Sequence, residues 1–440
     1  MISLAEARAL IAEKISPLPA QPAAVAMAFG RVLREDVRAD ADLPAFDRSA
    51  MDGYAVVLSD DSEKFRIIGE IQPGAAPSFK INCGECARIF TGAQIPDGAS
   101  QVLMQEDVRV ETTGAPASSR RVSETEATRR QDASAPVFIV PLQRGRATHI
   151  RKRGEDARKG DLLLRSGTRL GAGELALLAS LGVVEPHVSP PVRVAHFTTG
   201  NELVPPSAKP GPGQIRDSNS TLVGAFVRQF GGDISRQEIV PDDFELLREK
   251  VLREQDNFDL LLVSGGASVG DYDFGKKLLG ALGFQIHFEK INLRPGKPLV
   301  FATRGEQAAF ILPGNPVSHF VTLHVAVRLA LEKLVAQASS LCVQRADAET
   351  HRLEACATTG LPLAKLRLAE NFDYRPDARE TFWSARVEIQ NGELVVRALR
   401  WQSSGDVTGL TGVNALLQLA GGAEPPKAGD VVPVLLLEVP

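Results

Sequence analysis

Residues 258–279, FDLLLVSGGASVGDYDFGKKLL, contain the pattern that decides the fold. The apolar run 260–263 has the length of a buried strand, and a loop of small residues separates it from a segment with helical spacing. A strand, a loop and a helix in this order form the repeating unit of a parallel α/β sheet. Backbone N–H groups in such a loop can approach an anion, and the N-terminus of the following helix favours negative charge. The candidate ligand-binding residues here are Ser264, Gly265, Gly266, Ser268 and Gly270.

This loop is neither a Walker motif nor a dinucleotide-binding fingerprint, because GxxxxGK[ST] and GxGxxG are absent from it. A tight turn without a ligand is the alternative interpretation. On either side, strands alternate with helices, with a strand at 192–198, helices at 220–232 and 244–254, and a long helix at 317–335. The segment 186–336 is therefore predicted to be an α/β domain with helices on both faces of a parallel sheet. Ligands bind such sheets at the carboxyl ends of their strands.

The flanking segments have different patterns. Residues 3–15 predict a helix that begins with a capping box of Ser3 and Glu6, and 171–183 predict a second helix. Residues 40–110 contain short apolar runs between Gly, Pro, Asp and Asn, which is typical of a β-rich module. Residues 111–135 are poor in large apolar side chains and predict a mobile insertion, and the tail from about 340 predicts a small β-barrel or sandwich.

Composition excludes several classes of protein. A chain of 440 residues with 44% hydrophobic content should form several domains. The 50 Lys and Arg residues face 54 Asp and Glu residues, so no basic field exists to bind nucleic acid. No apolar stretch reaches the length of about 18 residues that a membrane span needs, and the N-terminus does not resemble a signal peptide. We therefore expect a cytoplasmic protein without a membrane or nucleic-acid partner.

The four cysteines exclude a disulfide framework. Cys83 and Cys86 form a lone CxxC, which could be half of a zinc site or a redox pair, but two incidental thiols are the favoured interpretation. No Ser/His/Asp or Cys/His pattern marks a covalent nucleophile. His319 and His324 lie in a largely apolar segment and are predicted to be packing groups or groups that support ligand-binding residues without touching the ligand.

Two more loops contain groups suited to anions. In LPGNPVSHF (312–320), two prolines stiffen the turn before the long helix, which makes its N-terminus a second candidate anion site. Its candidate residues are Pro313, Gly314, Asn315, Pro316 and Ser318. In NLRPGKPLVF (292–301), Arg294 and Lys297 flank a Pro-Gly turn and suit phosphate or a tetrahedral oxyanion. An exposed basic turn is the alternative for that loop.

Carboxylates in loops complete the set of candidates. They are Asp52, Asp156, Glu202, Asp273 and either Asp242 or Asp243, and Asp217 before the helix at 220–232 is a further ligand-binding candidate. Carboxylates that converge on phosphates usually do so through a hard cation such as Mg²⁺. Each of them alone would also fit a solvated turn, so the hypothesis depends on the joint pattern.

The motifs DRSAMDGYA (47–55), RIFTGAQIPDGA (88–99), RGEDARKGD (153–161), TTGNEL (198–203), SGGASVGDYD (264–273), RPGKP (294–298) and LPGNPVS (312–318) occur in this order. Together they resemble the molybdopterin molybdenumtransferase family, which includes bacterial MoeA and the E domain of gephyrin. The similarity extends from residue 1 to about 335 and weakens in the last hundred residues.

The resemblance implies four domains and a homodimer. An elongated dimerisation domain would consist of residues 1–40 and 150–185, an inserted β-rich domain of 41–149, the α/β molybdopterin-binding domain of 186–336, and a C-terminal β-barrel of 337–440. The implied reaction inserts molybdate into adenylyl-molybdopterin with Mg²⁺ and releases AMP. A contact with the molybdopterin adenylyltransferase is also implied.

The resemblance also implies roles for individual residues. Glu202 and Asp273 would hold Mg²⁺, the glycine loop and the 313–318 loop would bind phosphate and pterin, and Arg294 and Lys297 would meet molybdate or phosphate. Asp52 and Thr91 match functional positions in the inserted domain, which would face the partner subunit and share the active site. Asp156 and Asp242 complete the catalytic candidates, and Ser404 in SSGDVTGL matches a ligand-binding position.

The sequence departs from the family pattern at Asn201, where aspartate is usual, at Arg294, where lysine is common, and at Ser384, where arginine is common. The last change puts the contribution of the barrel to molybdate binding in doubt. Two other functions remain as alternatives, a molybdopterin adenylyltransferase and a non-catalytic molybdopterin-binding or scaffold protein.

Overall fold

The computed structural model describes all residues except 113–135, 144, 146, 266–271, 337–359 and 438–440, and for Tyr272 and Asp273 it describes only the backbone. The chain forms two compact units. One consists of Met1–Glu35 and Arg165–Pro440, and the other of Asp36–Leu164. The predicted insertion at 111–135 lies almost entirely outside the described residues, as do Gly266, Ser268 and Gly270.

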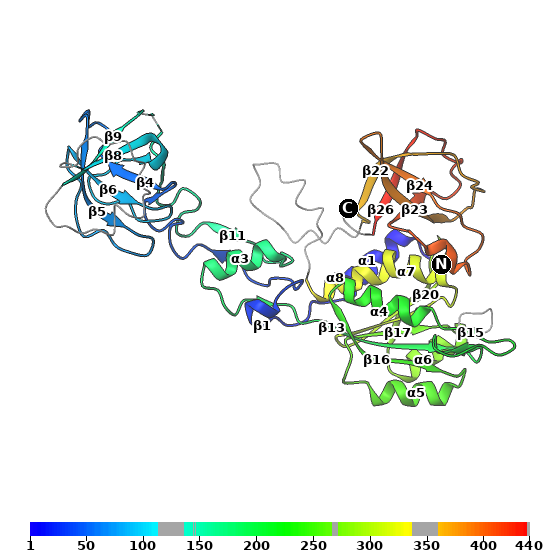
Figure 1. The fold of residues 1–440 in the computed structure, drawn as a ribbon. Helices are drawn as coiled ribbons and strands as arrows, with labels where there is room; N and C mark the ends of the chain where they lie inside the picture. The colour runs from blue at the N-terminus through cyan, green and yellow to red at the C-terminus, as the bar shows by residue number, and fades with distance from the viewer. Residues whose placement is uncertain (113–135, 144, 146, 266–271, 337–359, 438–440) are drawn as a thin grey trace. The chain divides into compact units, whose positions relative to one another are not determined.

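A six-stranded sheet forms the centre of the first unit (Figure 1). Its order is β16-β13-β17-β21-β20-β18, with the bounds Val192–Thr199 (β13), Gly232–Val240 (β16), Leu260–Ser264 (β17), Gln285–Lys290 (β18), Pro298–Arg304 (β20) and Gln307–Leu312 (β21). The strands from β16 to β21 are parallel to one another, which confirms the prediction for the sheet core. In contrast, β20 is antiparallel to both β21 and β18, because Gly305 and Glu306 alone connect β20 to β21 and a parallel connection needs a longer crossover.

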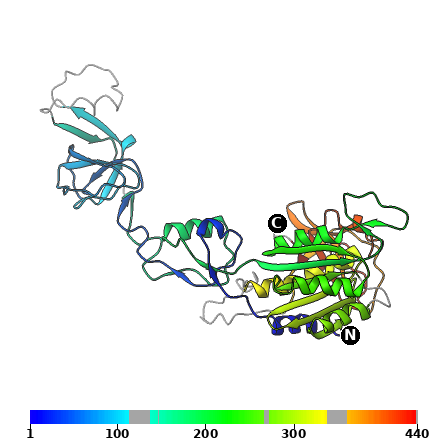
Figure 2. The same ribbon diagram turned by 90° about the horizontal axis from the view of Figure 1, so that it is seen from below.

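Helices cover both faces of this sheet, as predicted (Figures 1 and 2). On one face, α5 (Phe244–Arg253) and α6 (Tyr272–Ala281) bury apolar side chains. On the other face lie α1 (Leu4–Lys14), α4 (Asn219–Gln229) and a final helix, which contribute to the largest apolar core. This final helix consists of α7 (Pro316–Thr322), a π-helical turn (Leu323–Val327) and α8 (Arg328–Leu334).

Helix α1 begins as the sequence predicts. The Ser3 side chain accepts a hydrogen bond from the Glu6 backbone, and the Glu6 carboxylate accepts one from the Ser3 backbone. The buried Arg8 of α1 donates to the Val325 carbonyl at 2.6 Å, inside the π-helical turn. A π-helical turn disturbs the regular i to i−4 ladder, so an outside donor at this point stabilises it.

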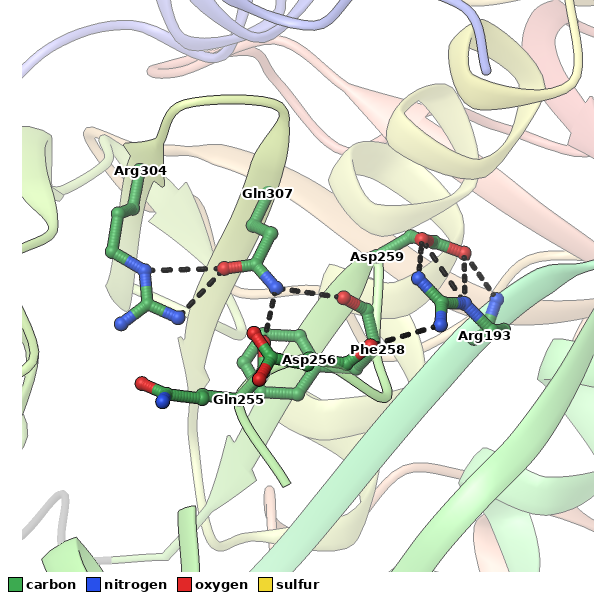
Figure 3. Close-up of polar contacts among 7 residues, drawn as sticks. All are labelled: Arg193, Gln255, Asp256, Phe258, Asp259, Arg304 and Gln307. Carbon is green, nitrogen blue, oxygen red and sulfur yellow. Dashed lines mark hydrogen bonds and ion pairs between the residues drawn. The ribbon is translucent and has the colours of Figure 1, made fainter. Parts of the chain in front are cut away.

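A polar network connects the amino ends of the central strands (Figure 3). The Arg193 guanidinium at the start of β13 donates to the Asp259 carboxylate just before β17, at 2.7 Å. Gln307, the first residue of β21, donates to the backbone oxygens of Gln255 and Phe258, and its side-chain oxygen accepts from Arg304. These bonds stabilise the amino-end edge of the sheet. The candidate ligand residues lie at the opposite edge, at the carboxyl ends of the strands.

The C-terminal part forms a closed five-stranded β-barrel, which confirms one of the two predicted architectures. Its strands are β22 (Leu363–Leu368), β23 (Glu380–Gln390), β24 (Glu393–Ala398), β25 (Ala415–Leu419) and β26 (Val431–Leu436). Pairing of β23 with both β24 and β25 closes the ring, and β19 (Leu293–Arg294) extends β23. The ribbon of β1 (Gln21–Pro22) and β12 (His187–Val188) and the helix α3 (Ala172–Ser180) also belong to the first unit.

The second unit is β-rich, as predicted. Its six-stranded sheet has the order β7-β4-β6-β5-β9-β8, with the bounds Gly53–Val56 (β4), Phe65–Ile71 (β5), Glu85–Ile89 (β6), Gln101–Met104 (β7), Val108–Thr112 (β8) and Val137–Pro141 (β9). Two short ribbons complete it, β2 (Val37–Arg38) with β11 (Leu162–Leu164) and β3 (Arg48–Ser49) with β10 (Ile150–Arg151). The pairing of β2 with β11 brings the entry and exit of this unit together.

Candidate active site

A cleft of about 1150 Å³ opens at the carboxyl ends of β13, β17 and β21 in the first unit. Loops of the α/β sheet and, from a barrel loop, residues 401–405 and Val407 line it. The candidate residues that meet here are Glu202, Asp217, Asp242, Gly265, Arg294, Lys297, Pro313, Gly314, Asn315, Pro316, Ser318 and Ser404. Ser264 is fully buried at the end of β17, next to the lining residue Gly265.

Other candidate residues lie elsewhere. Asp52, Thr91 and Asp156 belong to the second unit. Thr91 donates to one Asp52 carboxylate oxygen through its backbone N–H at 2.7 Å and its hydroxyl at 2.8 Å, and these bonds lower the Asp52 pKa. Asp156 forms an ion pair with Arg151. Asp273 lies in the first turn of α6, with its side chain outside the described part of the chain.

The barrel contacts the loop that follows β21. The Asn315 side-chain amide donates to the Ser404 hydroxyl at 2.9 Å, and the Val317 N–H donates to the Ser404 carbonyl at 3.0 Å. Pro316 occupies the first turn of α7, where its missing N–H leaves no unmet donor. Ser404 therefore connects the barrel to the N-terminus of a helix on the rim of the cleft.

Carboxylates gather beside the ends of β13 and β16. Asn201 and Asp242 bond reciprocally, because the Asn201 N–H donates to the Asp242 carboxylate and the Asp242 N–H donates to the Asn201 side-chain oxygen. The neutral Asn201 thus pairs with Asp242 without adding another negative charge. A Cβ on Gly200 would lie 2.7 Å from a Glu202 carboxylate oxygen, which the exposed Glu202 side chain could relieve by moving, so the φ of +156° at Gly200 is what favours glycine here.

Cations and aromatic rings lie beside the barrel loops. Arg294 and Arg379 both form ion pairs with Asp377, at 3.5 and 2.8 Å. The hydrogen bonds from Arg379 contribute most, and the charge of Arg294 adds to them, to lower the Asp377 pKa to about 2. The Arg294 guanidinium lies 5.3 Å from the centre of the Trp401 ring, within cation–π range. Lys297 forms no ion pair with any residue that the structure describes, so its charge remains available to an anion.

Two buried histidines support the floor of the cleft. Burial lowers the pKa of His196 to about 3 and that of His319 to about 4, so both rings are neutral. Gln237 donates to the His196 Nδ1 at 3.0 Å, which places the proton on Nε2, 2.6 Å from the Ser264 hydroxyl. The His319 Nδ1 donates to the Pro313 carbonyl at 3.0 Å. His319 thus contacts a candidate ligand-binding loop from behind, in agreement with the prediction that it packs or supports such residues.

Sequence reasoning missed several residues of the cleft. Asn219, Arg379, Trp383 and Trp401 line it, and the two tryptophans are the only ones in the chain. Their rings contact each other with centres 4.6 Å apart. Ser384 is buried on β23 beside Trp383 and does not line the cleft. The presence of the two tryptophans was the one available signal, because aromatic side chains commonly line the binding sites of small molecules.

The fold and the cleft define a class of protein. Basic and acidic loops lie at the carboxyl ends of the parallel strands of the α/β domain, and a barrel loop lies beside them. This arrangement is typical of a multidomain protein that binds a polar, anionic small molecule. No helix among the described residues is both long and apolar enough to cross a membrane.

Comparisons with known proteins identify the family. Residues 2–182 match the model of the MoeA N-terminal region (domain I and II), 195–333 match a probable molybdopterin binding domain, and 365–437 match the MoeA C-terminal region (domain IV). The molybdopterin molybdenumtransferase of Bacillus subtilis is 32% identical over 92% of this chain and 87% of its own length. That of Haemophilus influenzae is 34% identical over 77% of this chain and 78% of its own length.

A solved structure agrees with these matches. The molybdopterin biosynthesis MoeA protein of Pyrococcus horikoshii has a TM-score of 0.74 and 25% sequence identity over 100% of both chains. The chain belongs to the molybdopterin molybdenumtransferase family and is a transferase of molybdenum cofactor biosynthesis.

Proposed function

We propose that this enzyme inserts molybdate into adenylyl-molybdopterin, releases AMP and yields molybdenum cofactor. The observation that carries the proposal is the division of the cleft, in which Arg294 and Lys297 lie among barrel and turn residues while Glu202 and Asp242 follow neighbouring strands. A substrate with a phosphoanhydride and a tetrahedral oxyanion needs cations to neutralise its charge. It also needs carboxylates where a hard cation assists.

In this mechanism the protein mainly positions its substrates and neutralises their charge. Lys297 approaches the oxyanion, while Asp377 holds the Arg294 guanidinium in place. Ser404 and Asn315 fix the loop that would bind the phosphate. A molybdate oxygen then attacks the adenylyl phosphorus and forms a new P–O bond while the anhydride P–O bond breaks, and the electron pair of the broken bond leaves with the molybdopterin phosphate. The two dithiolene sulfurs of molybdopterin bond to molybdenum, and AMP leaves with the attacking oxygen as its Mo–O bond breaks.

Glu202 and Asp273 would hold Mg²⁺, which would supply charge neutralisation at the phosphoanhydride when bound. The exposed Glu202 carboxylate is the kind of oxygen donor that Mg²⁺ prefers. Among the described side chains, which exclude that of Asp273, no group of three His, Cys, Asp or Glu residues could hold a metal ion. Waters and substrate oxygens would therefore complete the Mg²⁺ shell, as is usual for this ion.

The remaining parts of the proposal concern the assembly. The enzyme works as a cytoplasmic homodimer whose active site is shared between subunits, with Asp52 and Thr91 serving the partner's cleft, and Asp156 is a further catalytic candidate in the same unit. The hydrogen bonds that keep Asp52 charged support a role that needs a carboxylate. The adenylyltransferase that makes the substrate would deliver it through a transient contact.

AMP release from adenylyl-molybdopterin tests this function. We expect release that requires both molybdate and Mg²⁺, and that falls steeply in Asp273→Asn, with Asp271→Asn as the matched control. Binding of the substrate without release by the wild-type enzyme would instead favour the scaffold function. Formation of adenylyl-molybdopterin from ATP and molybdopterin would favour the adenylyltransferase.

A further inference from the structure

Two buried polar side chains on the wall of the cleft each keep one oxygen unpaired. Asp217 is only 3% exposed and Asn219 only 8%, and both line the cleft where α4 begins. The Asp217 Oδ2 and the Asn219 Oδ1 have no hydrogen-bond partner among the described residues. Buried polar atoms are almost always paired, so two unpaired oxygens on residues two positions apart in the lining of one cleft indicate a missing partner.

The bonds that these side chains do make define the chemistry of that partner. The Asp217 Oδ1 accepts from the Ser220 N–H at 3.1 Å, which leaves Oδ2 as a second acceptor. The Asn219 amide nitrogen donates to the Gly314 carbonyl at 2.8 Å, and this bond fixes the side-chain oxygen as an acceptor too. Both free atoms accept hydrogen bonds and one carries negative charge. A phosphate is therefore excluded at this point, and a group with N–H donors fits.

We propose that Asp217 and Asn219 bind the pterin ring of the substrate by its 2-amino group and the adjacent ring N3–H. This inference rests on the proposed function, which supplies the substrate, and assigns part of that substrate to named atoms. The pterin edge offers two neighbouring donors, which matches two acceptors. Adenine, the other heterocycle, places a ring-nitrogen acceptor beside its amino group, and that acceptor would oppose a carboxylate oxygen.

The test compares ring binding by calorimetry with the full-length enzyme. The probes are 6-hydroxymethylpterin, 6-hydroxymethyllumazine, which has a carbonyl in place of the 2-amino group, and AMP. Asp217→Asn keeps an acceptor for Ser220 and replaces the free oxygen by an amide donor. Thr221→Ala is the matched control, because Thr221 lies on α4 two residues after Asn219 but is exposed and does not line the cleft.

We expect the wild-type enzyme to prefer the pterin over the lumazine by about tenfold or more, since a site built for a donor discriminates against its absence. In Asp217→Asn the preference should reverse, because the new amide donor suits the lumazine carbonyl. If Asp217 had a purely structural role, the substitution would lower the affinity for the pterin and for the lumazine equally. Thr221→Ala should keep the wild-type preference.

Three results would overturn the inference. The first is an unchanged ratio of the pterin and lumazine affinities in Asp217→Asn. The second is the absence of saturable pterin binding by the wild-type enzyme. The third is a loss of AMP binding alone in Asp217→Asn, which would assign the two oxygens to adenine. Loss of Mg²⁺ binding with an unchanged ratio would assign them to a cation. Wild-type AMP release is measured separately, so the inference can fail while the proposed function stands, and absent release refutes that function by itself.

Discussion

Acidification should destabilise the first unit through its buried histidines. His196, His319 and His324 are fully buried, and burial lowers their pKa values from 6.5 to about 3, about 4 and about 3. Below pH 6.5 these histidines bind protons in the unfolded chain but stay neutral in the folded chain. The free energy of unfolding therefore falls as the pH falls. The loss begins near the unfolded pKa of 6.5 and continues until the folded values near 3 to 4 are reached.

The magnitude follows from the pKa differences. One pH unit corresponds to about 1.4 kcal/mol for each proton that differs between the states. At about pH 5, roughly 1.5 units below the unfolded value, each histidine should reduce the free energy of unfolding by about 2 kcal/mol. The three together should remove about 6 kcal/mol, which is a large part of the stability of an ordinary domain.

His324 offers a clean test because it lies away from the cleft. Its ring packs against Phe226 and Phe320, and its Nδ1 has no partner among the residues described. His324→Leu should therefore reduce the loss between about pH 7.5 and pH 5 by roughly a third, measured by urea unfolding with far-UV circular dichroism. His187→Gln changes an exposed histidine and serves as the control. An equal loss in His324→Leu and the wild type would refute the reasoning.

Three further outcomes are expected. Gly265→Ala would place a Cβ 2.3 Å from the Thr199 carbonyl oxygen at φ +95°, so we expect a loss of about 2–4 kcal/mol in urea unfolding and a distorted cleft; a loss below about 0.5 kcal/mol would contradict this. Ser404→Ala removes the acceptor of the Asn315 amide and should slow AMP release about tenfold, whereas Thr411→Ala, at an exposed position outside the cleft lining, should leave the rate unchanged; equal rates in wild type and Ser404→Ala would exclude the role given to Ser404. Chelation of Mg²⁺ should abolish AMP release, which added Mg²⁺ should restore; activity that persists in the chelator would rule out a metal requirement.

Local signals in the sequence predicted the elements well. The capping box of Ser3 and Glu6 starts α1 as expected, because both partners lie within one helical turn. The carboxyl-end rule for parallel strands predicted that Glu202, Gly265 and the 313–318 loop meet, since that rule depends only on strand direction. The antiparallel β20 was missed, although the short Gly305-Glu306 turn was its signal.

The contacts that shape the cleft could not be predicted in the same way. The Arg294 and Trp401 pair joins positions more than a hundred residues apart, and nothing local in either segment marks it. The bond between Asn219 and the Gly314 carbonyl likewise depends on how α4 and the 313–318 loop approach each other. The π-helical turn in the final helix was expected to be regular helix, because its stabilising donor, Arg8, comes from the other end of the chain.

The long separation between Arg8 and Val325 has a consequence for synthesis on the ribosome. Their hydrogen bond joins positions 317 residues apart, and α1 packs into a core built largely from later segments. At about 5–20 residues per second, the apolar face of α1 waits roughly 15–60 s for its partners to be translated. The β-rich unit, whose strands all lie between residues 36 and 164, can fold during that wait. We therefore expect the nascent chain to expose α1 to chaperones until the last helix of the α/β domain emerges.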